Sequence, residues 1–198
     1  MQNGRNGAVV LVVFLLYATA MIAQTIRAPF GKPVMLDGKI QPGEWSDATS
    51  LPMPSGGRFY VKKSNGFVYI AVQLPDDRSG FTDLYVAPES SGVYDLHASA
   101  KLGERRLQDG KWGEWHEWWN NDGWVANVSR VDSFDKRTFL PAKVREYQIE
   151  RARFGELSWR VMVGMSLESR SNDYTVVRFP ASASDWNTDK WLQIIFGD

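Results

Sequence analysis

Short strand-like runs separated by turn residues recur along most of the chain, and this pattern constrains the fold more than any other feature. The runs 58–63 and 67–74 flank Asn65-Gly66. An Asn-Gly pair between β-rich runs is the strongest short-range signal for a β-hairpin. In the second run every other residue is aliphatic, which predicts that one face lies in the core: Val68, Ile70, Val72 and Leu74.

Further runs continue this pattern to the end of the chain. Residues 145–151 alternate with Tyr147 and Ile149 on one face. Residues 157–167 also alternate, with Leu157, Trp159, Val161, Val163 and Met165 on one face. Turn signals recur about every 8–12 residues and helical periodicity is nearly absent, a combination typical of sandwiches and barrels. We therefore predict an all-β fold, a single antiparallel β-sandwich of jelly-roll or immunoglobulin-like type, over residues 30–198.

The first 23 residues predict export. A polar start with Arg5 precedes the apolar run Ala8–Tyr17, and small residues follow it. This order is that of a secretory signal peptide, with cleavage near Ala20 or Ala23. The apolar run is short of the ~20 residues that a membrane-spanning helix needs. We expect a secreted or periplasmic protein without a membrane partner.

Composition narrows the classes of partner. The chain has 23 basic and 23 acidic residues, so there is no basic excess for nucleic acid or for a membrane surface. It has no cysteine, which excludes a lipid anchor on cysteine and means that stability must come from the core rather than from disulfides. A neutral partner such as a carbohydrate agrees with this charge balance.

Five of the nine tryptophans fall between Lys111 and Trp124 in the sequence KWGEWHEWWNNDGW. Tryptophan suits either a core or a flat, partly polar ligand such as a sugar ring. The turn residues 120–123 predict a hairpin between the runs 111–119 and 124–130, in which alternate residues share a face. One face would then be core: Trp115, Trp119, Trp124, Ala126 and Val128. The other would be a binding platform, with Trp112, Glu114, His116, Trp118 and Asn127 as its ligand-binding residues; packing of Trp112 and Trp118 against the sandwich is the alternative.

Residues 36–48 read LDGKIQPGEWSDA, which places a turn at Asp37-Gly38 and a buried tryptophan at Trp45. This opening resembles the start of family-9-type carbohydrate-binding modules, a DOMON-like group of β-sandwiches. The later stretches FVYIAVQLPD, DLYVAP, REYQIERARFG and LSWRVMVGMSL resemble strands of that family in the same order. The resemblance extends from Val34 to Phe196.

The resemblance implies a non-catalytic domain that binds an oligosaccharide or polysaccharide between tryptophans, often as an accessory to a glycan-degrading enzyme. Some members carry structural calcium. Asp76, Asp77 and Asp83 could supply oxygen ligands to calcium, but their spacing is not that of an EF-hand, which favours a solvated turn. DOMON-type relatives bind haem instead and transfer electrons. In that alternative His97 or His116, with Met162 or Met165, would be the axial ligands.

No catalytic constellation is found in the sequence. Glu114 and Glu117 fall on opposite faces of the predicted strand, which argues against a glycosidase pair, and no G-x-S-x-G or P-loop motif occurs. We therefore predict a carbohydrate-binding domain rather than an enzyme. A haem-binding electron-transfer domain and a structural or interaction module of the cell envelope remain as alternatives.

Overall fold

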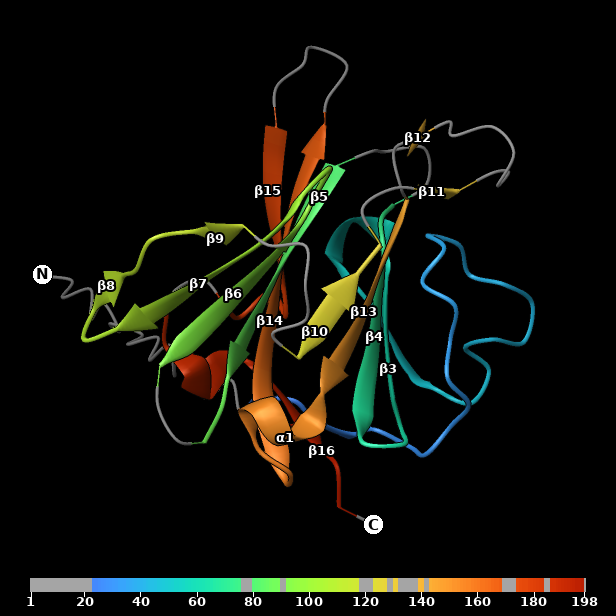
Figure 1. The fold of residues 1–198 in the computed structure, drawn as a ribbon, viewed down its shortest axis with the longest axis horizontal. Helices are drawn as coiled ribbons and strands as arrows, with labels where there is room; N and C mark the ends of the chain where they lie inside the picture. The colour runs from blue at the N-terminus through green and yellow to red at the C-terminus, as the bar shows by residue number, and fades with distance from the viewer. Residues whose placement is uncertain are drawn as a thin grey trace, which may run out of the picture.

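Two β-sheets packed face to face form most of the described chain (Figure 1). The computed structural model describes residues 23–75, 80–89, 92–117, 123–127, 130–131, 139–140, 143–168, 174–183 and 186–197. Within these residues no helix is long and apolar enough to cross a membrane. The predicted signal peptide falls almost entirely on residues 1–22, which lie outside the described ranges.

The larger sheet carries the candidate site on one of its faces. Its strands run in the order β1 (Thr25–Arg27), β16 (Leu192–Ile195), β14 (Ser158–Glu168), β5 (Gly80–Ala87), β6 (Val93–Ala98), β7 (Leu102–Gln108) and β8 (Lys111–Trp112). Two more strands join from the side: β15 (Tyr174–Phe179) pairs with β14, and β9 (His116–Glu117) pairs with β7. All of these pairings are antiparallel except that of β1 with β16.

The smaller sheet is antiparallel throughout and covers one face of the larger sheet. Its strands run in the order β10 (Trp124–Ala126), β13 (Val144–Glu150), β4 (Phe67–Gln73), β3 (Arg58–Ser64) and β2 (Thr49–Pro52). A separate ladder joins β11 (Arg130–Val131) to β12 (Phe139–Leu140). The helical segments are single turns: η1 (Pro54–Gly56), α1 (Arg151–Phe154) and η2 (Thr188–Lys190). The prediction of an all-β sandwich is confirmed.

The core lies between the two sheets and follows the pleat that the sequence predicts. The aliphatic face of β4 is buried in it together with Tyr147 and Ile149 of β13, and the larger sheet contributes Leu84 and Leu96. Trp159, Val161 and Met165 of β14 are also buried there, as the alternation predicts. Removing this much apolar surface from water is the main stabilising contribution in a chain without disulfides.

The predicted hairpin at Asn65-Gly66 is confirmed. Strands β3 and β4 pair in a register that places Ser64 opposite Phe67, which leaves a two-residue loop. Asn65 and Gly66 have φ values of 48° and 83°. Two positive φ values in succession are those of a type I′ turn, and asparagine and glycine are the residues that tolerate them.

The outer face of the smaller sheet is covered by the segment 34–48. Trp45 of this segment packs against Tyr69, Ala71 and Val144, and it is 4% exposed. Buried Glu146 accepts hydrogen bonds from the Gly38 N–H at 2.8 Å and from Trp45 Nε1 at 3.3 Å. Asp37 accepts a bond from the Lys39 N–H at 3.0 Å, which confirms its role as a turn former. This segment therefore covers the outer face of the smaller sheet.

The predicted hairpin between the runs 111–119 and 124–130 is wrong. β8 and β9 both pair with β7 in the larger sheet, whereas β10 pairs with β13 in the smaller sheet. The turn that forms a hairpin is Asp109-Gly110, where both residues have positive φ and join β7 to β8. The chain therefore passes from one sheet to the other between β9 and β10.

Candidate functional site

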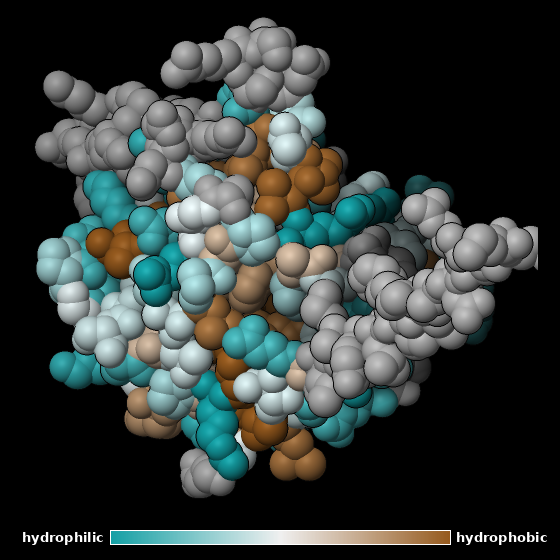
Figure 2. Space-filling model, turned by 180° about the vertical axis from the view of Figure 1, so that it is seen from behind, coloured by the Kyte–Doolittle hydropathy of each residue, from teal (hydrophilic) through white to brown (hydrophobic). Residues whose placement is uncertain are grey.

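The outer face of the larger sheet carries a row of side chains that the pleat of β5, β6 and β7 aligns. Tyr85 lies opposite Asp95, and Asp95 lies opposite Arg105 in the strand register. Their neighbours Leu84 and Leu96 point the other way, into the core. Figure 2 shows the molecule from behind, where strongly hydrophobic residues, coloured brown, form a broken stripe between hydrophilic ones; tryptophan and tyrosine are not among the brown residues in this colouring.

Aromatic rings follow one another across this outer face. We call them the aromatic band, which consists of Trp191, Trp186, Tyr85, Trp112, Trp115, His97, Phe81 and Tyr174. Trp186 lies edge-on to both Trp112 and Tyr85, with ring centroids 5.1 and 5.2 Å apart. At the other end, His97 contacts Trp115 at 5.7 Å and Phe81 at 5.3 Å.

Two tryptophans of the band present their rings to solvent. Trp186 is 45% exposed and Trp115 is 44% exposed, whereas Trp191 is fully buried. Trp191 packs with Met162 and Ala183 and so fixes the segment before β16 on this face. An exposed indole held by a buried one is an arrangement that can stack on a flat ligand without a large loss of side-chain freedom.

Arg105 fills the space between Trp112 and Trp115. Its Cζ lies 4.4 Å from the ring centroid of Trp112 and 4.3 Å from that of Trp115, which is cation–π geometry on both sides. Its Nε donates a hydrogen bond to Asp95 Oδ2 at 2.9 Å. The two indoles are thus held apart by a charged group that lies against a ring of each.

Asp95 is the carboxylate at the base of this arrangement. Its side chain is completely buried, and its Oδ1 has no hydrogen-bond partner in the described part of the chain. Burial and the nearby carboxylate of Asp83 raise the pKa of Asp95 to about 7, although the contact with Arg105 acts in the opposite direction. Asp95 is therefore a titrating group at neutral pH.

His97 is held by two polar partners. Its Nδ1 lies 2.5 Å from Asp83 Oδ1, and its Nε2 lies 2.9 Å from Ser99 Oγ. With both ring nitrogens engaged, His97 positions the ring of Trp115 rather than offering a free nitrogen.

Two glycines let rings lie close to the strands on this face. A Cβ at Gly164 of β14 would be 3.2 Å from Tyr85 Cε2, and a Cβ at Gly103 of β7 would be 3.3 Å from Trp115 Cε3. Both distances are shorter than ordinary van der Waals contact, so a larger residue would displace the rings. The band therefore depends on small residues as well as on aromatic ones.

The residues that the sequence predicts for one binding platform do not lie together in the structure. Trp112 is half-buried on the outer face and belongs to the aromatic band. His116 and Glu114 are exposed in and beside β9, while Trp118 lies outside the described residues. Asn127 directly follows β10 of the smaller sheet and is 6% exposed; its side chain donates to Val144 O and accepts from the Glu146 N–H of β13. Asn127 thus lies beside the smaller sheet, whereas Trp112 is in the larger one.

The tryptophans predicted for the core also lie in different environments. Trp124 is 2% exposed and its Nε1 donates to Glu104 Oε2 at 2.9 Å, so this prediction is confirmed. Trp115 is 44% exposed, so its assignment to the core is wrong. The error follows from the hairpin that does not form. Trp119 lies outside the described residues.

Trp186, Tyr85 and Arg105 were not predicted from the sequence. The alternation of DLYVA placed Asp83 and Tyr85 on one face, which was a usable signal. No local pattern marks Trp186, because it reaches Tyr85 from a segment 101 residues further along the chain.

The sequence also contains candidate ligands for calcium and, in the alternative function, for haem. Within the described ranges no three His, Asp or Glu side chains form a group that could hold a metal ion. Asp76 and Asp77, two of the calcium candidates, lie outside those ranges, and the third, Asp83, contacts His97. Met162 and Met165, the haem candidates, are each at most 1% exposed.

Comparison with known proteins places the fold. No protein-family model matches the chain, and no curated protein matches it. A solved structure does: a carbohydrate-binding module of family 9 from Caldicellulosiruptor kristjanssonii, in complex with cellotriose. The match covers 87% of this chain and 93% of the module, with a TM-score of 0.50 and 12% sequence identity. The chain thus shares the fold of a family 9 carbohydrate-binding module, as the opening motif predicted.

Proposed function

We propose that this protein is an exported, non-catalytic carbohydrate-binding domain and that the aromatic band on the larger sheet is its binding face. The observation that carries the proposal is the pair of exposed indoles, Trp115 and Trp186, on either side of the Arg105–Asp95 pair. Exposed aromatic rings with a few fixed polar groups beside them are what binding a sugar ring requires.

Each component has a role in this proposal. Trp186 and Trp115 stack on the apolar faces of sugar rings, and each stacking contact stabilises the complex by about 1 kcal/mol. Arg105 donates to sugar hydroxyls with the N–H groups that Asp95 does not use. Trp112 supports both Trp186 and Arg105, while His116 and Glu114 lie at the exposed edge formed by β9. Assistance to a glycan-degrading enzyme is the wider role that we propose for such a domain.

Titration calorimetry with soluble cello-oligosaccharides tests the proposal, because the structurally similar module is complexed with cellotriose. Trp186→Ala and Trp115→Ala should each weaken binding by about five- to tenfold, as expected for the loss of about 1 kcal/mol. Leu157→Ala is the matched control, because Leu157 is 68% exposed but outside the band. If wild-type protein binds and neither tryptophan variant is weakened, the binding face is wrong; a panel of glycans without any binding would overturn the function itself.

A further inference from the structure

A pocket beside the aromatic band is a part of the molecule that the proposed function does not use. It lies where the end of β5 and the start of β6 meet the β7–β8 turn and η2. Its volume is about 410 Å³, within the range of small-molecule sites. We call it the end pocket, and its lining includes Ala87, Pro88, Val93, Leu107, Gln108 and Thr188.

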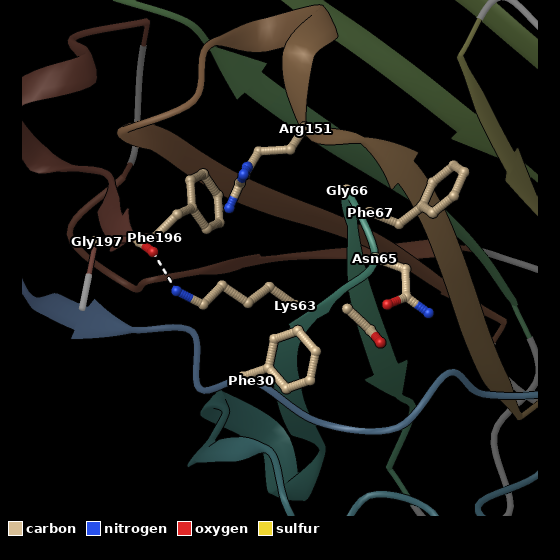
Figure 3. A pocket seen from close by; sticks show the side chains of 9 residues that line it. Phe30, Lys63, Asn65, Gly66, Phe67, Arg151, Phe196 and Gly197 are labelled. Atoms are coloured by element: carbon tan, nitrogen blue, oxygen red, sulfur yellow. Dashed lines mark hydrogen bonds between the residues drawn. The ribbon is translucent and has the colours of Figure 1, made fainter.

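Another pocket, at the β3–β4 turn, has a different relation to the band (Figure 3). Its described lining residues, among them Phe30 and Phe67, are not those of the aromatic band. Lys63 places its ammonium group in this lining by donating to the Phe196 carbonyl oxygen (Figure 3). The end pocket, by contrast, is continuous with the band.

The apolar lining of the end pocket lies on the same face of the larger sheet as the row of Tyr85, Asp95 and Arg105. On each of β5, β6 and β7 the lining residue is two positions from that row, and alternate residues of a strand share a face. These lining residues are Ala87, Val93 and Leu107. Leu107 also lies opposite Trp112 in the β7–β8 register, and both pack on the same buried cluster. Two residues of a strand span about 7 Å, so a sugar stacked on the band reaches the end pocket with a substituent.

The apolar part of this lining is aliphatic, and no aromatic ring belongs to the described lining. Ala87 and Val93 are buried, while Pro88 and Leu107 are half-buried. Such side chains suit a small apolar group such as a methyl, which is stabilised when it leaves water. Hydroxyl groups of an unsubstituted sugar would lose water there without a hydrogen bond from these aliphatic side chains.

Polar groups lie at the edge of the end pocket. Gln108 is exposed, and its side-chain amide offers both a donor and an acceptor. Thr188 is half-buried, and its carbonyl oxygen accepts from Arg160 Nη1 at 3.0 Å and from the Trp191 N–H at 3.1 Å, which fixes its backbone. A carbonyl group bonded to a methyl therefore finds a donor at the edge and an aliphatic surface within.

The charges around the end pocket are balanced. Asp109 is the charged residue of the described lining and is exposed at the tip of the β7–β8 turn. Asp189 pairs with Arg160 at 2.7 Å. The charged residues next to lining residues in the chain are two of each sign, namely Glu89, Asp189, Arg106 and Lys111. An uncharged group therefore suits this surface better than an anion or a cation.

We propose that the end pocket binds the acetyl group of a sugar, and that the ligand of this face is an acetylated glycan. The methyl group would lie on Val93 and Leu107, and the carbonyl oxygen would accept a hydrogen bond from Gln108 or Thr188. An acetamido group and an O-acetyl ester share this chemistry. The inference rests on the function proposed for the aromatic band, because the ring that carries the acetyl group stacks there.

Titration calorimetry with pairs of oligosaccharides that differ in acetylation tests this assignment. Cellotriose and N-acetylchitotriose share a backbone of linked glucose units, and an acetamido group replaces one hydroxyl of each unit in the second. Acetylated xylotriose and its deacetylated form give the comparison for an ester. In at least one pair the acetylated member should bind about three- to tenfold more tightly, as expected for burial of a methyl group together with one hydrogen bond. The pair that shows the preference identifies the linkage.

Variants at the end pocket make the test specific. Leu107→Ala removes aliphatic lining, and Gln108→Trp places a large ring in the lining from an exposed position. Each should reduce the preference for the acetylated member to about twofold or less. Lys111→Ala is the matched control, because Lys111 is exposed beside the lining but not part of it. Trp186→Ala should weaken both members of a pair alike, so that the preference is retained.

Equal or weaker binding of the acetylated member in both pairs would overturn the inference, and binding of cellotriose would then leave the proposed function standing. A preference that persists in both Leu107→Ala and Gln108→Trp would also overturn it, because the acetyl group would be bound elsewhere. Absence of binding by all four oligosaccharides would overturn the inference together with the proposed function. Thermal unfolding of each variant shows whether the fold is retained, and retention is expected at the exposed Gln108.

Discussion

Single tryptophans in this chain have opposite roles although they are close together in the sequence. Trp115 presents its ring to solvent beside Arg105, whereas Trp124, nine positions later, is buried against Tyr147. The difference arises because the chain passes from the larger to the smaller sheet between them.

Because Trp115 is exposed and Trp124 is buried, replacing each by alanine should lower the free energy of unfolding by different amounts. Trp124→Ala removes a ring from the core and the hydrogen bond to Glu104, so the free energy of unfolding should fall by about 3–5 kcal/mol. Trp115→Ala should cost about 1 kcal/mol or less, because the ring is 44% exposed and its contacts with Arg105 and His97 lie at the surface. Urea denaturation of both variants measures this. Equal losses would show that the two residues have been assigned to the wrong environments.

Asp95 predicts a pH dependence of stability. Burial and Asp83 raise its pKa from 3.8 to about 7, so the folded state holds the proton more tightly than the unfolded state. The contribution of this proton to stability is complete below pH 3.8, decreases as the pH rises from 3.8 to 7, and is absent above that range.

Asp95→Asn should make the free energy of unfolding less dependent on pH in this window. Denaturation curves at several pH values, compared with those of the wild type, measure the difference. Asparagine can still accept the hydrogen bond from Arg105 Nε, so the variant tests the proton rather than the contact. Identical pH profiles for the two proteins would mean that Asp95 keeps its ordinary pKa.

The segment 34–48 and the strands beneath it form the element that closes the smaller sheet. Glu146 of β13 joins them by accepting from Gly38 and Trp45, and burial raises the pKa of Glu146 to about 8. Lys62 adds bonds to Asp47 Oδ1 at 2.7 Å and to the Glu44 carbonyl oxygen at 2.6 Å.

Release of this segment should leave the other face of the molecule intact. Glu146→Ala removes the acceptor for two buried N–H groups, which costs about 1–3 kcal/mol for each donor left unsatisfied. We expect faster proteolysis within residues 34–48 and unchanged affinity for oligosaccharides. Limited proteolysis followed by mass spectrometry locates the cut, and calorimetry measures the affinity. Protection equal to that of the wild type would show that Glu146 does not hold the segment.

The sequence predicted correctly those structural features that depend on residues close together along the chain. The pleat of β4 and the turn at Asn65-Gly66 depend on neighbours along the chain, and both were predicted correctly. The partner of the run that begins at Lys111 depends instead on which strand is nearest in space. Turn residues occur on both sides of this run, at 109–110 and at 120–123. The turn at 109–110 forms the hairpin, in which β8 pairs with β7.

The candidate site could be predicted from the sequence only in part, for the same physical reason. Trp112 was found because clustered tryptophans are visible in the sequence. Trp186 and Arg105 were not, because their contacts with Tyr85 and Trp112 join distant segments. Leu157, expected to point inward with the rest of its run, is 68% exposed because it precedes the first residue of β14.

The whole molecule is a sandwich with one outer face covered by its own chain and the other left with an aromatic band. The fold is shared with a carbohydrate-binding module of family 9 at 12% identity, so the fold does not by itself determine the ligand. The binding face must therefore be tested on the residues of this chain.

The most direct measurement follows the indole N–H signals of ¹⁵N-labelled protein as cello-oligosaccharide is added. We expect the signals of Trp112, Trp115 and Trp186 to shift with the sugar, while those of buried Trp45 and Trp124 should not. Assignment by single Trp→Phe replacement identifies each signal. Shifts confined to the buried tryptophans, or no shift of Trp115 and Trp186 with a sugar that binds, would contradict the placement of the binding face on the larger sheet.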